Sequence, residues 1–227
     1  MKLSETRWLA FNGAVSTHLA QFDVLKEHFN AIVAKPKETC PAAESLAKYH
    51  NEMSNRLYLT FLKPVLQELT SYNLLFQSSY ADVTKVFRDL RTYVFTVAEK
   101  VIRPEALVQG QPGMLRMTEL QALKEALSRR DALKSLDSVA YGGNFRTLAA
   151  QAERERLLTP DELKAVKISC ANFLVKLLKE LVNRLPSSLE DIEKLKYFAP
   201  NLVMARRGRP MFHSLPFNLL REYYCLG

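Results

Sequence analysis

Three patterns that often decide a protein's chemistry are scarce in this sequence: paired cysteines, clustered histidines and glycine-rich loops. The three cysteines, Cys40, Cys170 and Cys225, are widely scattered and form no CxxC pair. An odd, scattered set argues against a disulfide framework and a cysteine-based zinc site, and it indicates a reducing compartment. The four histidines form no H-x3-H or HExxH pair. We therefore expect no metal site, and we interpret the histidines as solvated or core-edge side chains.

Long apolar runs and catalytic motifs are also missing. No uninterrupted apolar stretch approaches the length of a membrane span, and the charged N-terminus is not followed by the apolar segment of a signal peptide. We expect no membrane contact and a location in the nucleus, with the cytoplasm as the alternative. The sequence contains no GxSxG, GxxxxGK[ST] or GxGxxG motif. We therefore expect no catalytic residues, no cofactor and no small-molecule substrate.

Positive charge and apolar side chains are present in quantity. The chain has 32 Lys and Arg against 24 Asp and Glu, a formal net charge of +8, and a pI near 9.4. Such a field favours polyanions, including nucleic acid, but it does not locate a site. Hydrophobic residues make up 48% of the 227 positions, enough to bury a core without disulfides or a metal.

The spacing of the apolar residues predicts an all-α, multi-helix bundle with little or no sheet. Steps of three and four dominate, and alternating runs are nearly absent. We expect one long helix over 8–32, Leu46 on the apolar face of the next, and a kink or break at Pro64 in the one after that. Thr159-Pro160-Asp161-Glu162 has the pattern of a capping box, and we interpret Gly142-Gly143 as a turn that ends a helix. The remaining helices are expected over 83–101, from about 118, over 160–185 and over 188–198.

The breaks in this pattern divide the chain into four parts. Residues 104–117 contain two prolines and two glycines and are predicted to form a loop. An N-terminal helical part at 1–103 precedes it, and a C-terminal helical part of the same domain follows at 118–200. Residues 201–227 form an irregular basic tail.

The tail contains Arg206-Arg207-Gly208-Arg209-Pro210, in which R-G-R-P resembles the core of an AT-hook. A segment of that kind lies in the narrow minor groove of A·T-rich DNA, where arginine meets enhanced negative potential. The alternative is a solvated basic loop, since motifs this short also match by chance. Arg206, Arg207 and Arg209 are therefore candidate DNA contacts.

Several short segments, in the same order along the chain, resemble hAT-superfamily transposases. The match begins at Thr6-Arg7-Trp8-Leu9 and runs to about residue 204. The further segments are 21–29, 56–69, 73–77, 158–163, 172–174 and 183–186. The resemblance implies the helical insertion domain of an RNase H-like transposase. In the family the tryptophan matching Trp8 lies near transposon-end DNA, so Arg7 and Trp8 are carried over as DNA contacts.

The resemblance also implies that this chain does not catalyse transposition. The family's two catalytic aspartates precede the segment matching Arg7-Trp8, and no Glu-Trp pair follows Pro200. Strand transfer on two metal ions needs converging carboxylates. We therefore expect a non-catalytic, transposase-derived protein that contacts DNA or a protein partner, or that self-associates through its helices. The alternative is a truncated or decayed transposase fragment with no independent function.

Overall fold

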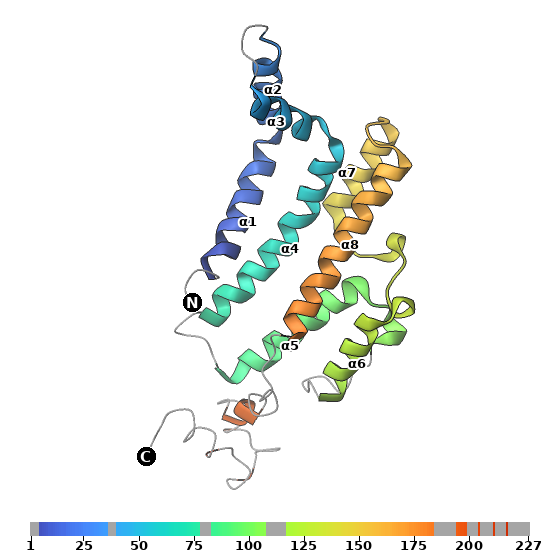
Figure 1. Cartoon of the computed structure of the whole chain (residues 1–227). Helices are drawn as coiled ribbons and strands as arrows, with labels where there is room; N and C mark the ends of the chain where they lie inside the picture. The colour runs from blue at the N-terminus through green and yellow to red at the C-terminus, as the bar shows by residue number, and fades with distance from the viewer. Residues whose placement is uncertain are drawn as a thin grey trace. The chain divides into compact units, whose positions relative to one another are not determined.

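The computed structural model describes residues 5–35, 40–77, 83–107, 117–183 and 194–198, with the single positions 204, 211 and 217. Within these residues the chain forms eight α-helices and no strand, which confirms the predicted all-α class (Figure 1). No helix in the described ranges is long and apolar enough to span a bilayer. The α-helices are α1 (Glu5–Ala20), α2 (Phe22–Val33), α3 (Pro41–Asn51), α4 (Met53–Gln77), α5 (Val83–Val101), α6 (Met117–Ser128), α7 (Gly143–Arg154) and α8 (Pro160–Asn183). Short 3-10 helices are η1 (Pro104–Ala106), η2 (Arg130–Ala132), η3 (Leu136–Ser138) and η4 (Leu195–Phe198).

The helices form two compact units that do not follow chain order. Unit 1 comprises Met1–Asn73 and Leu136–Phe173, and unit 2 comprises Leu74–Ser135 and Leu174–Gly227. The boundary falls inside α4 and α8, so both helices contribute to both units. The predicted loop belongs to unit 2, where its first residues form η1 and residues 108–116 lie outside the described residues.

Several aromatic rings meet in the interior of unit 1, among a larger number of buried aliphatic side chains. Phe61 on α4 meets Tyr141, Phe145 and Phe173 at ring-centroid distances of 6.3, 6.4 and 6.1 Å, all edge-on. Such T-shaped pairs add to the stabilisation from burial because the positive ring edge faces the negative ring face. Cys170 on α8 is fully buried and packs as a small apolar side chain.

Unit 2 has a largely aliphatic interior. α5 buries Val94, Val97 and Val101, which offsets the weak helix propensity of valine. The segment after η2 pairs with the end of α5, where the Lys134 N–H donates to the Val101 carbonyl at 2.8 Å. Helices α6 and α8 add buried leucines: Leu120, Leu123, Leu127, Leu174, Leu177 and Leu178.

The start of α8 confirms the predicted capping box. The Glu162 N–H donates to Thr159 Oγ1 at 3.2 Å, and the Thr159 N–H donates to Glu162 Oε2 at 2.8 Å. These reciprocal bonds satisfy two backbone donors. They also hold the pKa of the Glu162 carboxyl below its usual value, the backbone bond more than the hydroxyl bond.

The long helix predicted over 8–32 is wrong in one respect, since Gln21 interrupts it and separates α1 from α2. The Gln21 N–H still donates to Thr17, and the Leu25 N–H still donates to Gln21, at 3.0 and 2.9 Å. An apolar stripe at steps of three and four continues across such a one-residue interruption, so the pattern alone does not reveal it. Leu46, predicted on an apolar face, is 40% exposed on α3.

The interpretation of Gly142-Gly143 as the end of a helix is also wrong. Gly142 has φ 96° and ψ 159° and is the N-cap of α7, which begins at Gly143. This backbone region is open almost only to glycine, and it lets the chain turn directly into a helix. The sequence analysis did not predict α7, although Phe145, Ala149 and Ala152 repeat at helical spacing and are buried.

A kink or a break was expected at Pro64, and the break does not occur, because α4 runs without interruption from Met53 to Gln77. An interior proline costs about 3 kcal/mol because one backbone hydrogen bond is lost. Pro64 is exposed on α4. Burial of Phe61, Val65 and Leu66 in the same stretch of the helix, at roughly 1.5–3 kcal/mol each, outweighs that cost.

Candidate functional site

The predicted DNA contacts are only partly placed. Arg7 and Trp8 lie in the first turns of α1, and the backbone alone is described there. Arg206, Arg207 and Arg209 lie outside the described residues. The structure therefore does not test whether the two predicted groups lie together, and their role stays a prediction.

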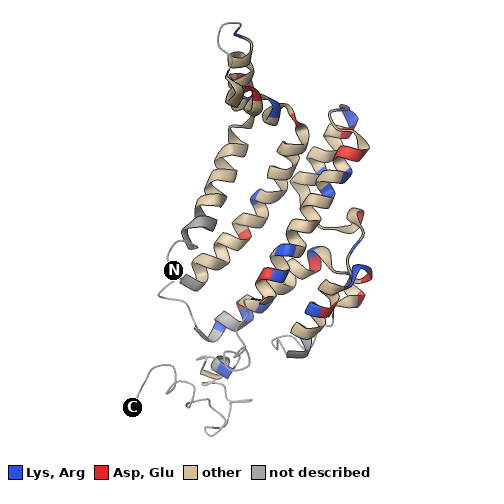
Figure 2. Ribbon diagram, in the orientation of Figure 1, with Lys and Arg blue, Asp and Glu red and all other residues tan. Residues whose placement is uncertain are grey.

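Positive charge is distributed unequally between the units. Unit 1 carries 13 Lys and Arg against 12 Asp and Glu, whereas unit 2 carries 19 against 12. Nearly all of the net charge of the chain therefore belongs to unit 2. Figure 2 shows the Lys and Arg positions along α5, α6 and the C-terminal part of α8.

Much of this charge in unit 2 is exposed in the described ranges. Lys124 lies on α6, and Lys176 and Lys179 lie three residues apart on α8, on one side of that helix. Exposed cations of this kind are available to a phosphate backbone. The full set of exposed basic residues in this part of unit 2 is Lys85, Arg88, Arg103, Lys124, Arg129, Arg130, Lys176, Lys179 and Lys194.

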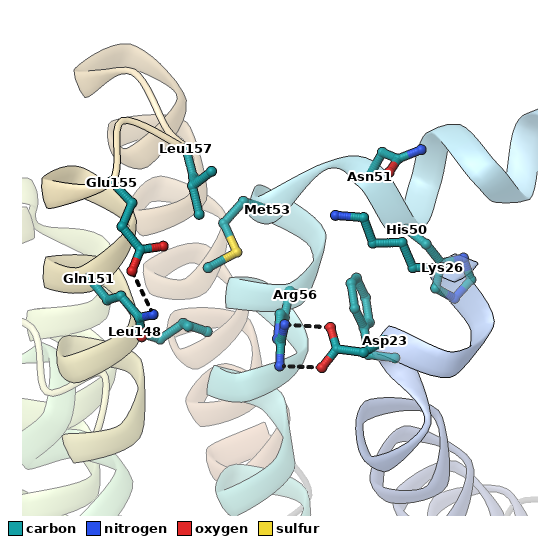
Figure 3. Close-up of a pocket in the computed structure, with 11 residues that line it drawn as sticks. Asp23, Lys26, His50, Asn51, Met53, Arg56, Leu148, Gln151, Glu155 and Leu157 are labelled. Carbon is teal, nitrogen blue, oxygen red and sulfur yellow. Dashed lines mark hydrogen bonds and ion pairs between the residues drawn. The ribbon is translucent and has the colours of Figure 1, made fainter. Parts of the chain in front are cut away.

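Unit 1 contains a small pocket between α2, the α3–α4 junction and α7 (Figure 3). Its volume is about 230 Å³, below the roughly 300–1,000 Å³ of a typical small-molecule site. Met53 and Leu148 give it apolar walls, and Leu157, which is 52% exposed, lies at its edge. The pocket is large enough for one or two side chains or a very small ligand.

The polar part of the pocket is an ion pair between α2 and α4. Arg56 Nη1 and Nη2 donate to the two carboxylate oxygens of Asp23 at 2.7 and 3.0 Å, and Figure 3 shows the two groups facing one another. The guanidinium also lies 5.5 Å from the ring centroid of Phe22. The side chains of Arg56 and Asp23 are 34% and 65% exposed, so solvent screens the pair and its net contribution is small.

Two histidines stack beside this pocket. The rings of His18 and His50 lie 5.0 Å apart with 15° between their planes, although the residues come from α1 and α3. His50 is 2% exposed, so it lies inside the core, which differs from the solvated or core-edge position predicted for the histidines. The sequence analysis missed this pair because the two residues meet only in the folded chain.

Burial holds two titratable side chains in the core of unit 1, Cys170 and Tyr141, in their neutral forms. Burial raises the pKa of the Cys170 thiol to about 12, so it carries almost no thiolate at neutral pH. Burial likewise raises the pKa of Tyr141, whose hydroxyl donates to the Leu136 carbonyl at 2.7 Å. No group of three or more His, Cys, Asp and Glu in the described part of the chain could hold a metal ion.

Comparisons with known proteins add no identification. No family model, curated protein or solved structure matches the chain. The resemblance to hAT transposases, the nuclear location and the non-catalytic character therefore stay predictions.

Proposed function

We propose that this chain is a non-catalytic binding protein that contacts nucleic acid through unit 2. The observation that carries the proposal is the charge distribution, 19 basic against 12 acidic residues in unit 2, beside near balance in unit 1. Neutralising phosphates with lysine and arginine releases condensed counterions, which supplies most of the affinity of sequence-independent binding. The proposal agrees with the DNA-contacting role that the transposase resemblance implies, but it rests on charge and not on that resemblance.

The proposal is tested by the salt dependence of binding. The full chain is titrated against a fluorescein-labelled 20-base-pair duplex, and anisotropy is measured at several NaCl concentrations. We expect log Kd to rise linearly with log salt, with a slope of about 0.9 per phosphate contact. A chain that shows no salt-dependent binding near 0.1 M salt contradicts the proposal.

A matched pair of triple variants locates the contact. Lys124→Gln, Lys176→Gln and Lys179→Gln together remove three exposed charges from unit 2. We expect this variant to lose affinity on the order of tenfold and to lose up to about 0.9 of slope for each lysine that meets a phosphate. The control removes three exposed charges from unit 1 by changing Lys48, Arg146 and Lys164 to Gln. An equal loss in both variants would mean that the contact is not specific to unit 2.

The competing hypothesis is a decayed fragment without independent function. Such a fragment would lack part of the surface against which it once packed, so its unfolding would not be cooperative. Thermal unfolding followed by far-UV and near-UV circular dichroism distinguishes the two, because coincident sigmoidal transitions indicate a two-state domain. Separate or featureless transitions would favour the fragment.

A further inference from the structure

Five aromatic rings from three helices form one cluster in unit 1. His18 lies on α1, Phe22 and Phe29 lie on α2, and Tyr49 and His50 lie on α3. The His18 and His50 rings stack at 5.0 Å, and Phe22 and Phe29 lie 5.0 and 5.5 Å from the His50 ring. Tyr49 meets His18 edge-on at 5.7 Å. The stacked histidines therefore connect α1 to α3 inside an aromatic environment.

A proton added to either ring at Nε2 would find no hydrogen-bond acceptor among the described residues. His50 Nδ1 lies 2.8 Å from the Leu46 carbonyl oxygen. A carbonyl only accepts, so Nδ1 carries the proton of the neutral ring and Nε2 is left as an acceptor. The Nε2 atoms of both His18 and His50 are buried and have no hydrogen-bond partner in the described part of the chain. Protonating either ring would create a buried charge without full hydrogen bonding.

The charged groups around the cluster are balanced in sign, and their carboxylates already accept hydrogen bonds. Asp23, Glu155, Lys26 and Arg56 line the pocket that His50 borders, so two cations accompany two carboxylates (Figure 3). Both oxygens of Asp23 are bound to Arg56, and Glu155 Oε1 accepts from the Gln151 amide. α3 carries Glu44 and Lys48 on its exposed positions, and α1 contributes no Asp, Glu, Lys or Arg among its described side chains. A second positive ring would also repel the first across 5.0 Å.

We propose that the His18–His50 pair is an acid-sensitive switch, which holds α1 against α3 only while both rings are neutral. Histidine is the side chain whose charge ordinarily changes between pH 5 and 8. When a structure opens, a histidine that was buried in its neutral form can take up a proton, so acid favours the open form. The switch is independent of the nucleic-acid contact proposed for unit 2, because it uses residues of unit 1 alone.

The direction of the pH effect follows from the stacked geometry and from the pKa of His18. Burial, and next the charge of His50, lower the pKa of His18 below its ordinary value of 6.5. The opened form therefore binds protons at a higher pH than the stacked form. The stacked arrangement keeps its full stability above about pH 6.5 and loses stability as pH falls below that value, until the lowered pKa is reached.

Hydrogen exchange of the full chain, followed by mass spectrometry at pH 6.5 and 5.5, tests the switch. After correction for the pH dependence of chemical exchange, the opening constant of α1 and α3 amides should rise by up to about fivefold for one proton taken up. Amides of α5 in unit 2 serve as the internal reference and should change little. An equal change in α1 and α5, or none in α1, overturns the proposal.

A pair of matched variants assigns the effect to the stacked rings. His18→Phe keeps an aromatic ring that does not titrate, and we expect it to abolish most of the pH response of α1. His28→Phe is the control, since His28 is exposed on α2 and should leave the response intact. Loss of the response in His28→Phe contradicts the assignment. If His18→Phe does not fold, NMR titration of the unmodified chain decides: the pKa of His18 must lie below its ordinary value of 6.5, and a midpoint at or above 6.5 overturns the switch.

Discussion

Unit 1 and unit 2 are built from parts of the same two long helices, α4 and α8, but they differ in charge and in the polar and aromatic groups that they hold. Unit 1 is nearly neutral and holds an aromatic core, a stacked histidine pair and a small pocket. Unit 2 carries the excess of positive charge around buried leucines and valines. The difference suggests a division of roles, in which unit 2 makes the electrostatic contact and unit 1 responds to acid.

The comparison is useful because the two kinds of side chain respond to different conditions. Lysine and arginine stay charged throughout the physiological pH range, so the contacts proposed for unit 2 should respond to salt and hardly to pH. The proposed histidine switch should respond to pH, and salt should screen it little because the His50 ring is buried. We therefore expect salt to act on unit 2 and acid to act on unit 1, and each condition can be varied while the other is held constant.

Truncating one core residue in each unit should have the largest effect and tests whether the units are energetically separate. Phe61→Ala removes the ring that meets three others in unit 1, and we expect a loss of about 3–5 kcal/mol in the free energy of unfolding. Ile102→Ala in unit 2, which is 0% exposed in the native chain, should lose about 2–5 kcal/mol. Urea denaturation gives both values.

Hydrogen exchange on the same two variants then shows whether each truncation destabilises only its own unit. If the units open separately, Phe61→Ala raises exchange in α7 but not in α5, and Ile102→Ala does the reverse. If both variants raise exchange throughout, α4 and α8 couple the units into one cooperative domain. That result would mean that the two units unfold together, and only their difference in charge would remain.

Two glycines of unit 1 should respond in opposite directions to the same substitution. Gly142→Ala forces a side chain into a backbone region open almost only to glycine, and we expect it to destabilise by about 1–3 kcal/mol. Gly13→Ala, inside α1, should stabilise by about 0.5–1 kcal/mol because alanine is the better helix former. A β-carbon at either position meets no atom within 4 Å, so clashes do not confuse the result. Thermal midpoints that move in the same direction in the two variants would contradict this account of the two glycines.

How much of this could be predicted depends on whether the deciding contacts are local. The capping box at Thr159 and Glu162 was predicted correctly because both partners lie within one helical turn. α7 was missed because Gly142 begins a helix here, whereas the same residue type often ends one. Phe145 and the two buried alanines after it provided a signal that a stricter search for helical spacing would have found.

The candidate sites were harder to predict than the helices. The histidine pair was not predictable, because His18 and His50 come together only when α1, α2 and α3 pack. The overall excess of basic residues was evident from composition, but its concentration in unit 2 was not, since each unit combines distant stretches of the chain. Composition gives the net charge of the chain, but the fold is needed to find which unit carries it.

The smallest effect is expected from the ion pair between Asp23 and Arg56. Measuring it tests whether the stability of unit 1 depends on electrostatic interactions. A double-mutant cycle with Asp23→Asn, Arg56→Gln and both together measures their coupling free energy. Because both side chains are partly exposed, we expect no more than about 1 kcal/mol, falling further in 0.5 M NaCl. Thermal or urea unfolding of the four proteins gives the value. A coupling free energy well above about 1 kcal/mol that does not change with salt would mean that the stability of unit 1 also depends on an ion pair. The two units would then not differ in their dependence on electrostatics.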